Sequence, residues 1–478
     1  MKLVKLLGSV ETKKLVNFKN INISSLAINS QEVEKNSLFF AIQGNNYNGE
    51  NFALEAVKNG AVAVVCENEI EGIDCPQILV ENCRKAMALI AKSYFHKSDE
   101  KLKIVGIVGT NGKTTTATII YNILKDAGHS VGLVGTNGVL INDLNLPSFL
   151  TTPDPIELHY IFEQMVLLNV EYCVMEISAQ AIYYNKVEGI NPDIIVYTNI
   201  TPEHLDFFGD FKYYANTKIN YILSHKNAKI IVNSDDENAV RILHNISCIT
   251  YGIYNPSDTF AININMTLTK SNFVCNVLDE VFEVNSNFVG VYNVYNILAA
   301  NTVAKILNIP TISVVKTLQN LKKVDGRWEV FDFKNNNKVI VDYAHTPDGF
   351  NKVLSLVKTL RKGRIITLFG CVGYSNSEKR KQMGDIVEKY SDFAIITSDN
   401  LSDKDFDKMF REIGITKYYA KIEDRAKAVE FGINLLDKND TLLLLGKGAE
   451  TVQKTANGDV EYSEINLVKE YQKRDNVG

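Results

Sequence analysis

Residues 109–115 constrain this chain more than any other segment, because they read G-T-N-G-K-T-T between a β-branched run and a helical pattern. Residues 104–108 are I-V-G-I-V, which predicts a buried parallel strand. Over 114–127 apolar residues recur at helical spacing, and Gly128 ends the pattern. A strand, a glycine-rich turn and a helix in this order predict a phosphate-binding loop.

Each part of this loop suits a nucleotide phosphate. Glycines let backbone N–H groups turn toward phosphate oxygens, and the helix N-terminus adds partial positive charge. Lys113 would supply a full charge to the β- and γ-phosphates, and Thr114 a hydroxyl to Mg²⁺. The standard spacing places glycine where this chain has Ile107, with Gly106 and Gly109 on either side, so the loop is a variant. A tight glycine turn with an incidental lysine is the weaker alternative, given the flanking strand and helix.

Strand and helix patterns alternate along most of the 478 residues, which predicts an α/β protein of about three domains. We expect a small N-terminal α/β domain over 1–100 that binds a uridine nucleotide, with the charged stretch 97–103 as its linker. A central ATP-binding domain over 101–324 would be a P-loop ATPase-like, doubly wound parallel sheet. Alternating residues over 260–291 predict added β-hairpins at its edge. A Rossmann-like C-terminal domain over 325–478 would bind the amino acid.

Charge and cysteine content exclude several classes of protein. The net charge of −5 and the absence of a dense Lys/Arg run argue against a nucleic-acid partner. The chain has no run of about 18 apolar residues and no signal-peptide pattern, so we expect no membrane partner and a cytoplasmic location. The seven cysteines form no C-x-x-C pair, which fits reduced thiols without a zinc or redox motif.

A nucleotide site also needs metal ligands, and two residues near predicted strand ends are candidates. Glu176 lies near the end of the apolar strand Tyr172–Ile177, at the edge of a parallel sheet where ligands bind. His204 follows the strand at 194–198 within a polar segment. A solvated glutamate and a capping or core histidine are the ordinary interpretations. The nearby phosphate loop favours the metal for Glu176 and leaves both interpretations open for His204.

Four motifs together resemble the Mur ligase family, and within it the UDP-N-acetylmuramoyl-tripeptide synthetases. They are G-T-N-G-K-T-T at 109–115, E-I-S-A-Q-A-I at 176–182, N-I-T-P-E-H-L-D at 199–206 and D-Y-A-H-T-P-D at 342–348. The resemblance covers nearly the whole chain, and the order and spacing of the motifs argue against a chance match. The resemblance implies an ADP-forming acid–amino-acid ligase (EC 6.3.2 type), which converts a carboxylate to an acyl phosphate for attack by an amine. The implied reaction adds the third amino acid to UDP-MurNAc-L-Ala-D-Glu in peptidoglycan precursor synthesis.

The resemblance also implies roles for single residues. Catalytic roles fall on Lys113, Lys218 and His204. ATP would contact Gly109, Thr110, Asn111, Gly112, Lys113, Thr114, Thr115, Asn293, Asn296, Arg327, Asp342 and His345. The UDP-MurNAc-dipeptide would contact Ser30, Thr151, Thr152 and Ser178, and the amino acid would contact Asp399, Asn400, Gly446 and Glu450. Two Mg²⁺ ions would be held by Thr114, Glu176, His204 and Lys218, the last as a carbamate that offers oxygen donors.

The resemblance is weakest where the family selects the third amino acid. Members that use meso-diaminopimelate carry D-N-P-R and a D-R-D turn, whereas this chain has Leu401 and Ser402 after Asn400, and Ser375 in the turn. Neither leucine nor serine can replace a guanidinium that holds a carboxylate bidentately. We therefore expect that meso-diaminopimelate is not preferred, and that L-lysine or another amine pairs with Glu450. Smaller departures are N-S-Q at 29–31 for the family's D-S-R, and Gln180 for its histidine.

Two other function classes fit the sequence less well. A ligase of a secondary-metabolite pathway would act on a different carboxylate, but the uridine-type segment at 28–44 and the T-T-P at 151–153 argue against it. A P-loop regulator or motor would hydrolyse ATP without ligation, but it needs no second metal site of the kind that Glu176, His204 and Lys218 imply. The expected partners are the UDP-MurNAc-dipeptide and one amino acid, and the expected state is a monomer.

Overall fold

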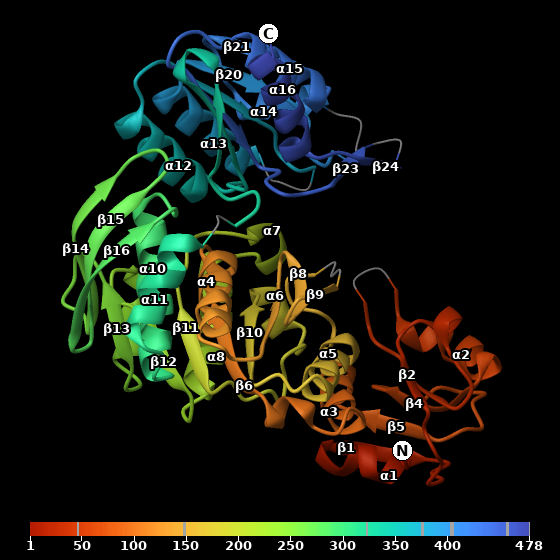
Figure 1. The fold of residues 1–478 in the computed structure, drawn as a ribbon. Coiled ribbons are helices and arrows are strands. Elements are labelled where there is room, and N and C mark those ends of the chain that lie inside the picture. Colours follow the sequence, from red (N-terminus) through yellow and green to blue (C-terminus); the bar gives the residue numbers. More distant parts are fainter. Residues whose placement is uncertain are drawn as a thin grey trace.

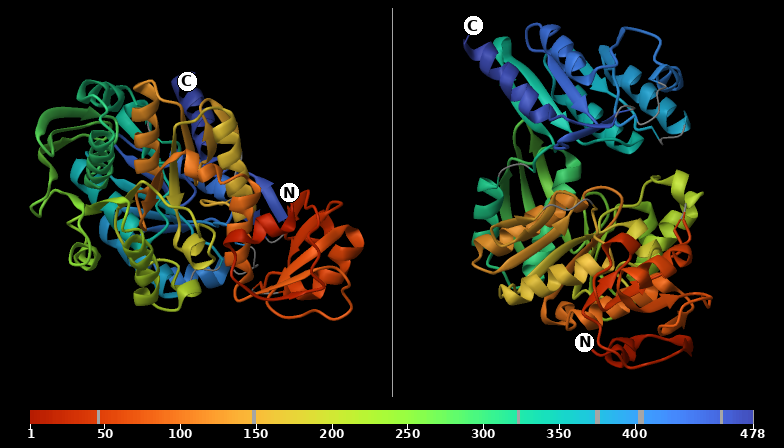
Figure 2. Two further views of the ribbon diagram at one scale, coloured as in Figure 1. Left: turned by 90° about the horizontal axis from the view of Figure 1, so that it is seen from below. Right: turned by 90° about the vertical axis from the view of Figure 1, so that its right-hand side faces the viewer.

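The structure is a computed structural model that describes residues 1–44, 47–146, 150–321, 324–373, 377–401, 406–455 and 458–477. In the described residues, three large β-sheets follow one another along the chain, each with its own helices, and a two-stranded hairpin is separate from them (Figure 1). The N-terminal and C-terminal domains adjoin different sides of the central domain (Figure 1 and Figure 2). The predicted three-domain α/β architecture is confirmed. The boundaries at 100/101 and 324/325, and the ligand of each domain, stay predictions.

The N-terminal sheet has the strand order β1-β5-β4-β3-β2, in which only β1 runs antiparallel to its neighbour. Its strands are β1 Thr12–Val16, β2 Ser25–Ala27, β3 Ser37–Phe40, β4 Ala61–Cys66 and β5 Gln77–Val80. Its helices are α1 Leu3–Leu6, α2 Ala53–Asn59 and α3 Cys83–Tyr94. Gly60 closes α2 at φ 124°, a backbone conformation that favours glycine.

Residues 97–103 lead from the first domain to the second, and Ser98, Asp99 and Leu102 of this charged stretch are buried. Asp99 is buried, and its Oδ2 accepts a hydrogen bond of 2.8 Å from Lys92 Nζ on α3. The same ammonium donates to the carbonyl of Gly189 in the central domain, at 2.7 Å. Burial of an ammonium requires such partners, so the ion pair ties the N-terminal domain to the central one.

The central sheet has eleven strands in the order β16-β15-β14-β13-β12-β11-β6-β10-β7-β8-β9. In its middle, β6 Lys103–Val108 lies between β10 Tyr172–Ile177 and β11 Ile194–Tyr197, all parallel. The other strands are β7 Val131–Gly135, β8 Gly138–Ile141, β9 Leu144–Leu146, β12 Lys229–Asn233, β13 Ile249–Gly252, β14 Thr259–Met266, β15 Ser271–Val277 and β16 Glu280–Ser286. The hairpins expected over 260–291 form one edge. A second antiparallel edge, β7–β8–β9, was not predicted.

Helices cover both faces of this sheet, as a doubly wound fold requires. One hydrophobic core joins it to α4 Lys113–Asp126, α10 Val291–Ile306 and α11 Thr311–Asn320. The core on the other face joins it to α5 Pro155–Leu167 and α8 Phe211–Ser224. The remaining short helices are α6 Ala179–Tyr183, α7 Leu205–Phe208 and α9 Val240–Leu243.

The C-terminal sheet has the order β17-β18-β22-β19-β20-β21 and is parallel except for β17, which confirms the predicted α/β pattern. Its strands are β17 Glu329–Phe333, β18 Asn337–Asp342, β19 Ile365–Phe369, β20 Phe393–Ile396, β21 Tyr419–Lys421 and β22 Thr441–Leu445, with a separate hairpin of β23 Val452–Thr455 and β24 Gly458–Glu461. Its helices are α12 Pro347–Leu360, α13 Ser377–Tyr390, α14 Phe406–Ile413, α15 Arg425–Asn434 and α16 Glu464–Val477.

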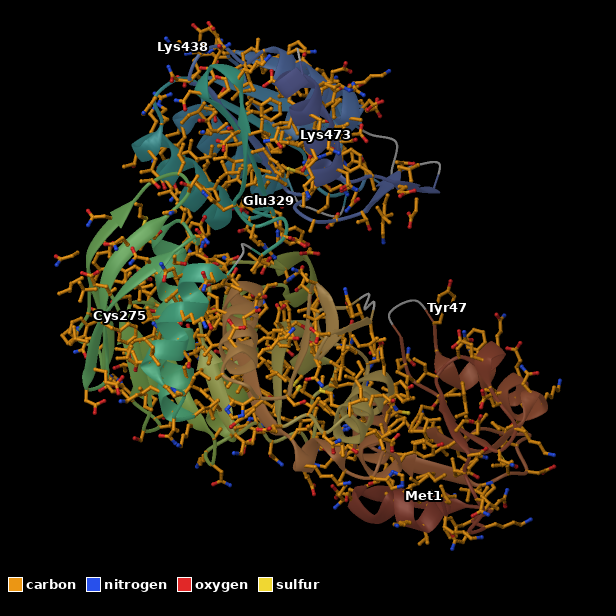
Figure 3. All side chains as sticks on the ribbon, viewed as in Figure 1. Met1, Tyr47, Cys275, Glu329, Lys438 and Lys473 are labelled. Carbon is orange, nitrogen blue, oxygen red and sulfur yellow. The ribbon has the colours of Figure 1, made fainter. Side chains whose placement is uncertain are left out.

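The carboxyl ends of the parallel strands meet where the second and third domains face each other. Residues after β6, β10 and β11 line the same cavity as residues after β18, β20 and β22. Figure 3 shows Glu329 on the side of the C-terminal domain toward the central domain and Lys438 on its far side. No helix in the described part of the chain is long and apolar enough to cross a membrane.

Candidate nucleotide and ligation site

The loop between β6 and α4 joins a strand to a helix N-terminus, as a phosphate-binding loop does. At two of its positions, a side chain larger than that of glycine would clash with a neighbour. A Cβ on Gly109 would lie 1.9 Å from Thr198 Oγ1, after β11. Gly112 has φ 86°, and a Cβ there would lie 2.4 Å from Asn296 Oδ1. Ile107, at the standard glycine position, is instead a buried residue of β6. The turn therefore starts later than in the standard motif, which explains the variant spacing.

Lys113, the first residue of α4, holds its ammonium over the loop. Its Nζ donates to the carbonyls of Gly109 at 3.0 Å and Thr110 at 2.8 Å. The residues Thr110, Asn111, Gly112, Lys113, Thr114 and Thr115 all line a cavity of about 600 Å³ between the central and C-terminal domains. A charged amine and a helix N-terminus at one cavity wall can bind phosphate oxygens.

Thr114 and Glu176 lie together beside this loop, as predicted. Thr114 Oγ1 donates to Glu176 Oε2 at 3.0 Å, and the backbone N–H of Thr136 donates to Glu176 Oε1 at 2.8 Å. Glu176 is buried at the carboxyl end of β10. A hydroxyl and a carboxylate at this separation fit Mg²⁺, which prefers oxygen ligands and keeps waters and phosphate oxygens as others. Accordingly, the described residues contain no cluster of three or more His, Cys, Asp or Glu side chains that could hold a metal by itself.

The loop after β11 places His204 and Glu203 at the cavity. His204 has a left-handed backbone, φ 54°, and a partly exposed imidazole. Burial lowers the pKa of His204 and the charge of Lys113 lowers it further, while Glu203 opposes them. Glu203 Oε1 lies 3.1 Å from Nε2 of His345 in the C-terminal domain. Burial raises the pKa of Glu203, but the hydrogen bond and charge of His345 outweigh it, so the pKa falls well below its usual range.

Lys218 lies behind the loop and does not have the exposed position that its helix pattern alone indicates. Its Nζ donates to the carbonyl of Gly109 at 2.7 Å and also contacts the Tyr214 hydroxyl. Burial holds the pKa of Lys218 well below its ordinary value, and the charge of Lys113 adds to this effect. Burial therefore shifts Lys218 toward the neutral amine, which is the form that can add carbon dioxide to give a carbamate.

A second cavity, of about 890 Å³, adjoins the loop and is lined by the predicted ATP-contacting residues outside the loop. They come from α10 and from the C-terminal domain: Asn293, Asn296, Arg327, Asp342 and His345. Asn296 Nδ2 donates to Asn293 Oδ1 at 3.0 Å, and Asp342 accepts from the backbone N–H groups of Trp328 and Ala344. Burial raises the pKa of Asp342, and Arg327 acts against this rise.

The first cavity also contains most of the predicted substrate residues. They are Thr151, Thr152, Ser178, Asp399, Asn400, Gly446 and Glu450. Ser30 is the exception, because it lies in the N-terminal domain, where its hydroxyl donates to Glu55 Oε2 at 2.7 Å. Leu401 is buried. Ser375 and Ser402, the two positions without the expected arginine, lie outside the described residues.

Direct contacts join the phosphate loop to the C-terminal domain. Asn111 Nδ2 donates to Asp348 Oδ2 at 3.0 Å, at the start of α12. Glu203, in the loop after β11, makes a second contact between the two domains with His345. From the sequence, Glu203 had no role of its own beyond the polar company of His204. The two domains thus enclose one space with a phosphate loop, metal-type ligands and further polar groups, which can hold a nucleotide and a second substrate together.

Comparisons with known proteins agree with this arrangement. Three family models match: the Mur ligase family catalytic domain at residues 22–95, the Mur ligase middle domain at 107–304, and the Mur ligase glutamate ligase domain at 326–448. Together with the site, they define an ATP-dependent ligase of the acid–amino-acid type. Curated relatives are more than 30% identical to this chain over nearly its whole length. The chain therefore belongs to the Mur ligase family.

Two such relatives are named UDP-N-acetylmuramoyl-L-alanyl-D-glutamate–2,6-diaminopimelate ligases. The proteins from Clostridium acetobutylicum and Caldanaerobacter subterraneus subsp. tengcongensis are each 36% identical to this chain, over 98% of it and over 99% and 98% of their own lengths. Among solved structures, a ligase of the same name has a TM-score of 0.71 at 24% identity, covering 100% of this chain and 99% of that one. The MurF ligase of Thermotoga maritima in complex with ADP has a TM-score of 0.64 at 22% identity, covering 94% and 97%. At these identities the structural similarity is evidence for the fold alone.

Proposed function

We propose that this ligase adds the third amino acid to UDP-MurNAc-L-Ala-D-Glu during peptidoglycan precursor synthesis, as a cytoplasmic monomer. The observation that carries the proposal is the shared cavity. Lys113 of the phosphate loop, Thr152 of the central domain, and Asn400 and Glu450 of the C-terminal domain all line it. ATP, an acceptor carboxylate and an amine can therefore meet in one enclosed space. The names of the full-length relatives support the same substrate.

The reaction has two steps. The acceptor carboxylate attacks the γ-phosphorus of ATP, which gives an acyl phosphate and ADP. The amine of the incoming amino acid then attacks the acyl carbon, inorganic phosphate leaves, and the amine loses a proton as the amide forms. Negative charge grows on phosphoryl oxygens, where the Lys113 ammonium and the loop N–H groups stabilise it. The contacts of Asn111 and Glu203 with the C-terminal domain would keep water from the acyl phosphate.

Two Mg²⁺ sites are part of the proposal. Thr114 and Glu176 would hold one ion, and His204 with carbamylated Lys218 would hold the other. Bound Mg²⁺ would supply further charge stabilisation for the phosphoryl group. The oxygen pair of Thr114 and Glu176, 3.0 Å apart, supports the first site. The burial of Lys218, which lowers the pKa of its amine, supports the carbamate.

The loop and the carbamate can be tested by substitution. Lys113→Ala should abolish phosphate release, because no other side chain replaces its charge on the loop. Lys218→Ala should reduce release strongly, and added formate or acetate should partly restore it by replacing the lost oxygen donor. Lys212→Ala, at an exposed lysine of the same helix, is the control and should leave the rate unchanged. Absence of rescue by either carboxylate would count against the carbamate.

The amino acid is the finer part of the proposal. We propose that meso-diaminopimelate is not preferred and that L-lysine or another amine is used, with Glu450 as the partner of its ammonium. The support is the absence of arginine at Ser375 and Ser402, since no guanidinium stands there to bind a second carboxylate. The names of the curated relatives favour 2,6-diaminopimelate as the second candidate.

An amino-acid panel separates these candidates. Phosphate release is measured with UDP-MurNAc-L-Ala-D-Glu and L-lysine, L-ornithine, L-alanine or meso-diaminopimelate. We expect turnover with a non-diaminopimelate amine, and a shift toward meso-diaminopimelate when Ser375→Arg and Ser402→Arg are combined. Turnover with meso-diaminopimelate alone in the unaltered enzyme would overturn the specificity. Turnover with none would favour the ligase of a secondary-metabolite pathway.

A further inference from the structure

A buried lysine lies behind the amino-acid end of the first cavity. Lys447 follows β22, and its side chain is 0% exposed. Lys447 does not itself line the cavity, but its neighbours Asp399, Asn400 and Glu450 do. An ammonium is stable away from water only where acceptors take its protons. Its partners therefore show what it holds in place.

The Lys447 ammonium has an acceptor for each of its three protons. Its Nζ donates to Asn400 Oδ1 at 2.7 Å, to Glu450 Oε2 at 2.9 Å and to the carbonyl of Val452 at 3.0 Å. Asn400 Nδ2 also donates to Glu450 Oε2, at 3.1 Å. Lysine, amide and carboxylate thus form a closed ring, in which two groups that line the cavity are fixed by one that does not.

Asp399 completes the charges at this end of the cavity. Its Oδ1 lies 3.7 Å from Lys447 Nζ and has no hydrogen-bond partner among the described residues. The nearby guanidinium of Arg425 is already paired with Glu464, at 2.6 Å. Within this cluster two acidic groups, Asp399 and Glu450, stand against the ammonium of Lys447, and burial raises the pKa of Asp399. This acidic excess suits a cationic amine better than a carboxylate.

We propose that Lys447 is a positioning residue for the incoming amino acid. Its ammonium orients Asn400 and Glu450 and neutralises part of the Glu450 charge, so that Glu450 keeps one oxygen, Oε1, for the amine of the substrate. The inference rests on the proposed function, in which Asn400 and Glu450 contact the amino acid. It adds a residue that specifies the amine without touching it.

Steady-state kinetics of Lys447→Met test this role, because methionine keeps much of the side-chain volume and removes the charge. We expect the KM for the accepted amino acid to rise about tenfold or more, as for a lost hydrogen bond to a charged group. The KM values for ATP and for UDP-MurNAc-L-Ala-D-Glu should stay within about twofold. Lys454→Met, at an exposed lysine on β23, is the matched control and should change none of the three.

A double-mutant cycle decides whether Lys447 acts through Glu450. In a Glu450→Gln background, Lys447→Met should raise the amino-acid KM far less than it does alone. Additive effects, an equal rise of all three KM values, or a fall in kcat alone would overturn the proposal. Should Lys447→Met fail to fold, the double variant lacks the unpaired carboxylate and is measured instead. Misfolding of both would make Lys447 a stability residue only. Turnover by the unaltered enzyme tests the proposed function separately.

Discussion

At the scale of single residues, Gly112 offers a sharp test of the phosphate loop. Gly112→Ala would place a Cβ 2.4 Å from Asn296 Oδ1 at a backbone φ of 86°. We expect the KM for ATP to rise about tenfold or more, since the strain of roughly 1–3 kcal/mol falls on the loop itself. Gly128→Ala is a matched control, because φ is 92° there but no atom lies within 4 Å of the added Cβ. It should lower the melting temperature and leave the KM unchanged. Equal KM values in both variants would contradict the steric argument.

The sequence identifies residues whose chemistry is visible locally and misses those defined by partners far along the chain. Lys113 and Thr114 could be assigned from the strand, glycines and helix around them. Lys218 could not, because its burial depends on the carbonyl of Gly109, which is 109 residues away. The role of Glu203 could not be assigned for the same reason, since its partner His345 belongs to another domain. A family resemblance supplied Lys218, and only the structure supplied Glu203 and Lys447.

At the scale of elements, a buried ion pair ties α15 to α16 in the C-terminal domain. Arg425 Nε lies 2.6 Å from Glu464 Oε1, and both side chains are 0% exposed. Arg425→Met leaves a buried carboxylate without its partner, so we expect a loss of about 3–5 kcal/mol in unfolding free energy. Asp385→Ala, which breaks the exposed pair of Lys381 with Asp385 on α13, should cost only about 0.5 kcal/mol. Urea unfolding of both variants measures the difference, and equal losses would contradict the prediction.

Prediction of elements succeeded where periodicity and stop signals agreed. The helix expected over 114–127 is α4, and the hairpins expected over 260–291 are β14 to β16. The hairpin strands β8 and β9 could not be predicted, because they are only four and three residues long. An alternation of apolar and polar residues is not recognisable over so short a segment. The charge of the stretch 97–103 predicts a linker but not that Asp99 within it is buried, which is possible because Lys92 compensates its charge.

At the scale of the whole molecule, the two junctions between domains differ in kind. The first is packed around the buried pair of Lys92 and Asp99. The second encloses the two cavities. Polar contacts of Asn111 with Asp348 and of Glu203 with His345 bridge it beside them, and elsewhere Val289 of the central domain shares a buried cluster with Trp328. A junction that encloses cavities and is held in part by polar contacts opens more readily than one that is packed throughout. We therefore expect the C-terminal domain to move during turnover and the N-terminal domain to stay fixed.

Asp348→Ala combined with Glu203→Ala tests this division of the molecule. Without the two bridges the C-terminal domain should swing outward, so small-angle X-ray scattering should show a larger radius of gyration for the nucleotide-free variant. ATP should reverse much of the change, because residues of both domains line the nucleotide cavity. The control is Lys85→Ala, which removes only the half-exposed pair with Glu188 at the first junction and should leave the radius unchanged. A variant as compact as the unaltered protein would show that packing between the domains, and not these two polar contacts, holds the ligation site closed.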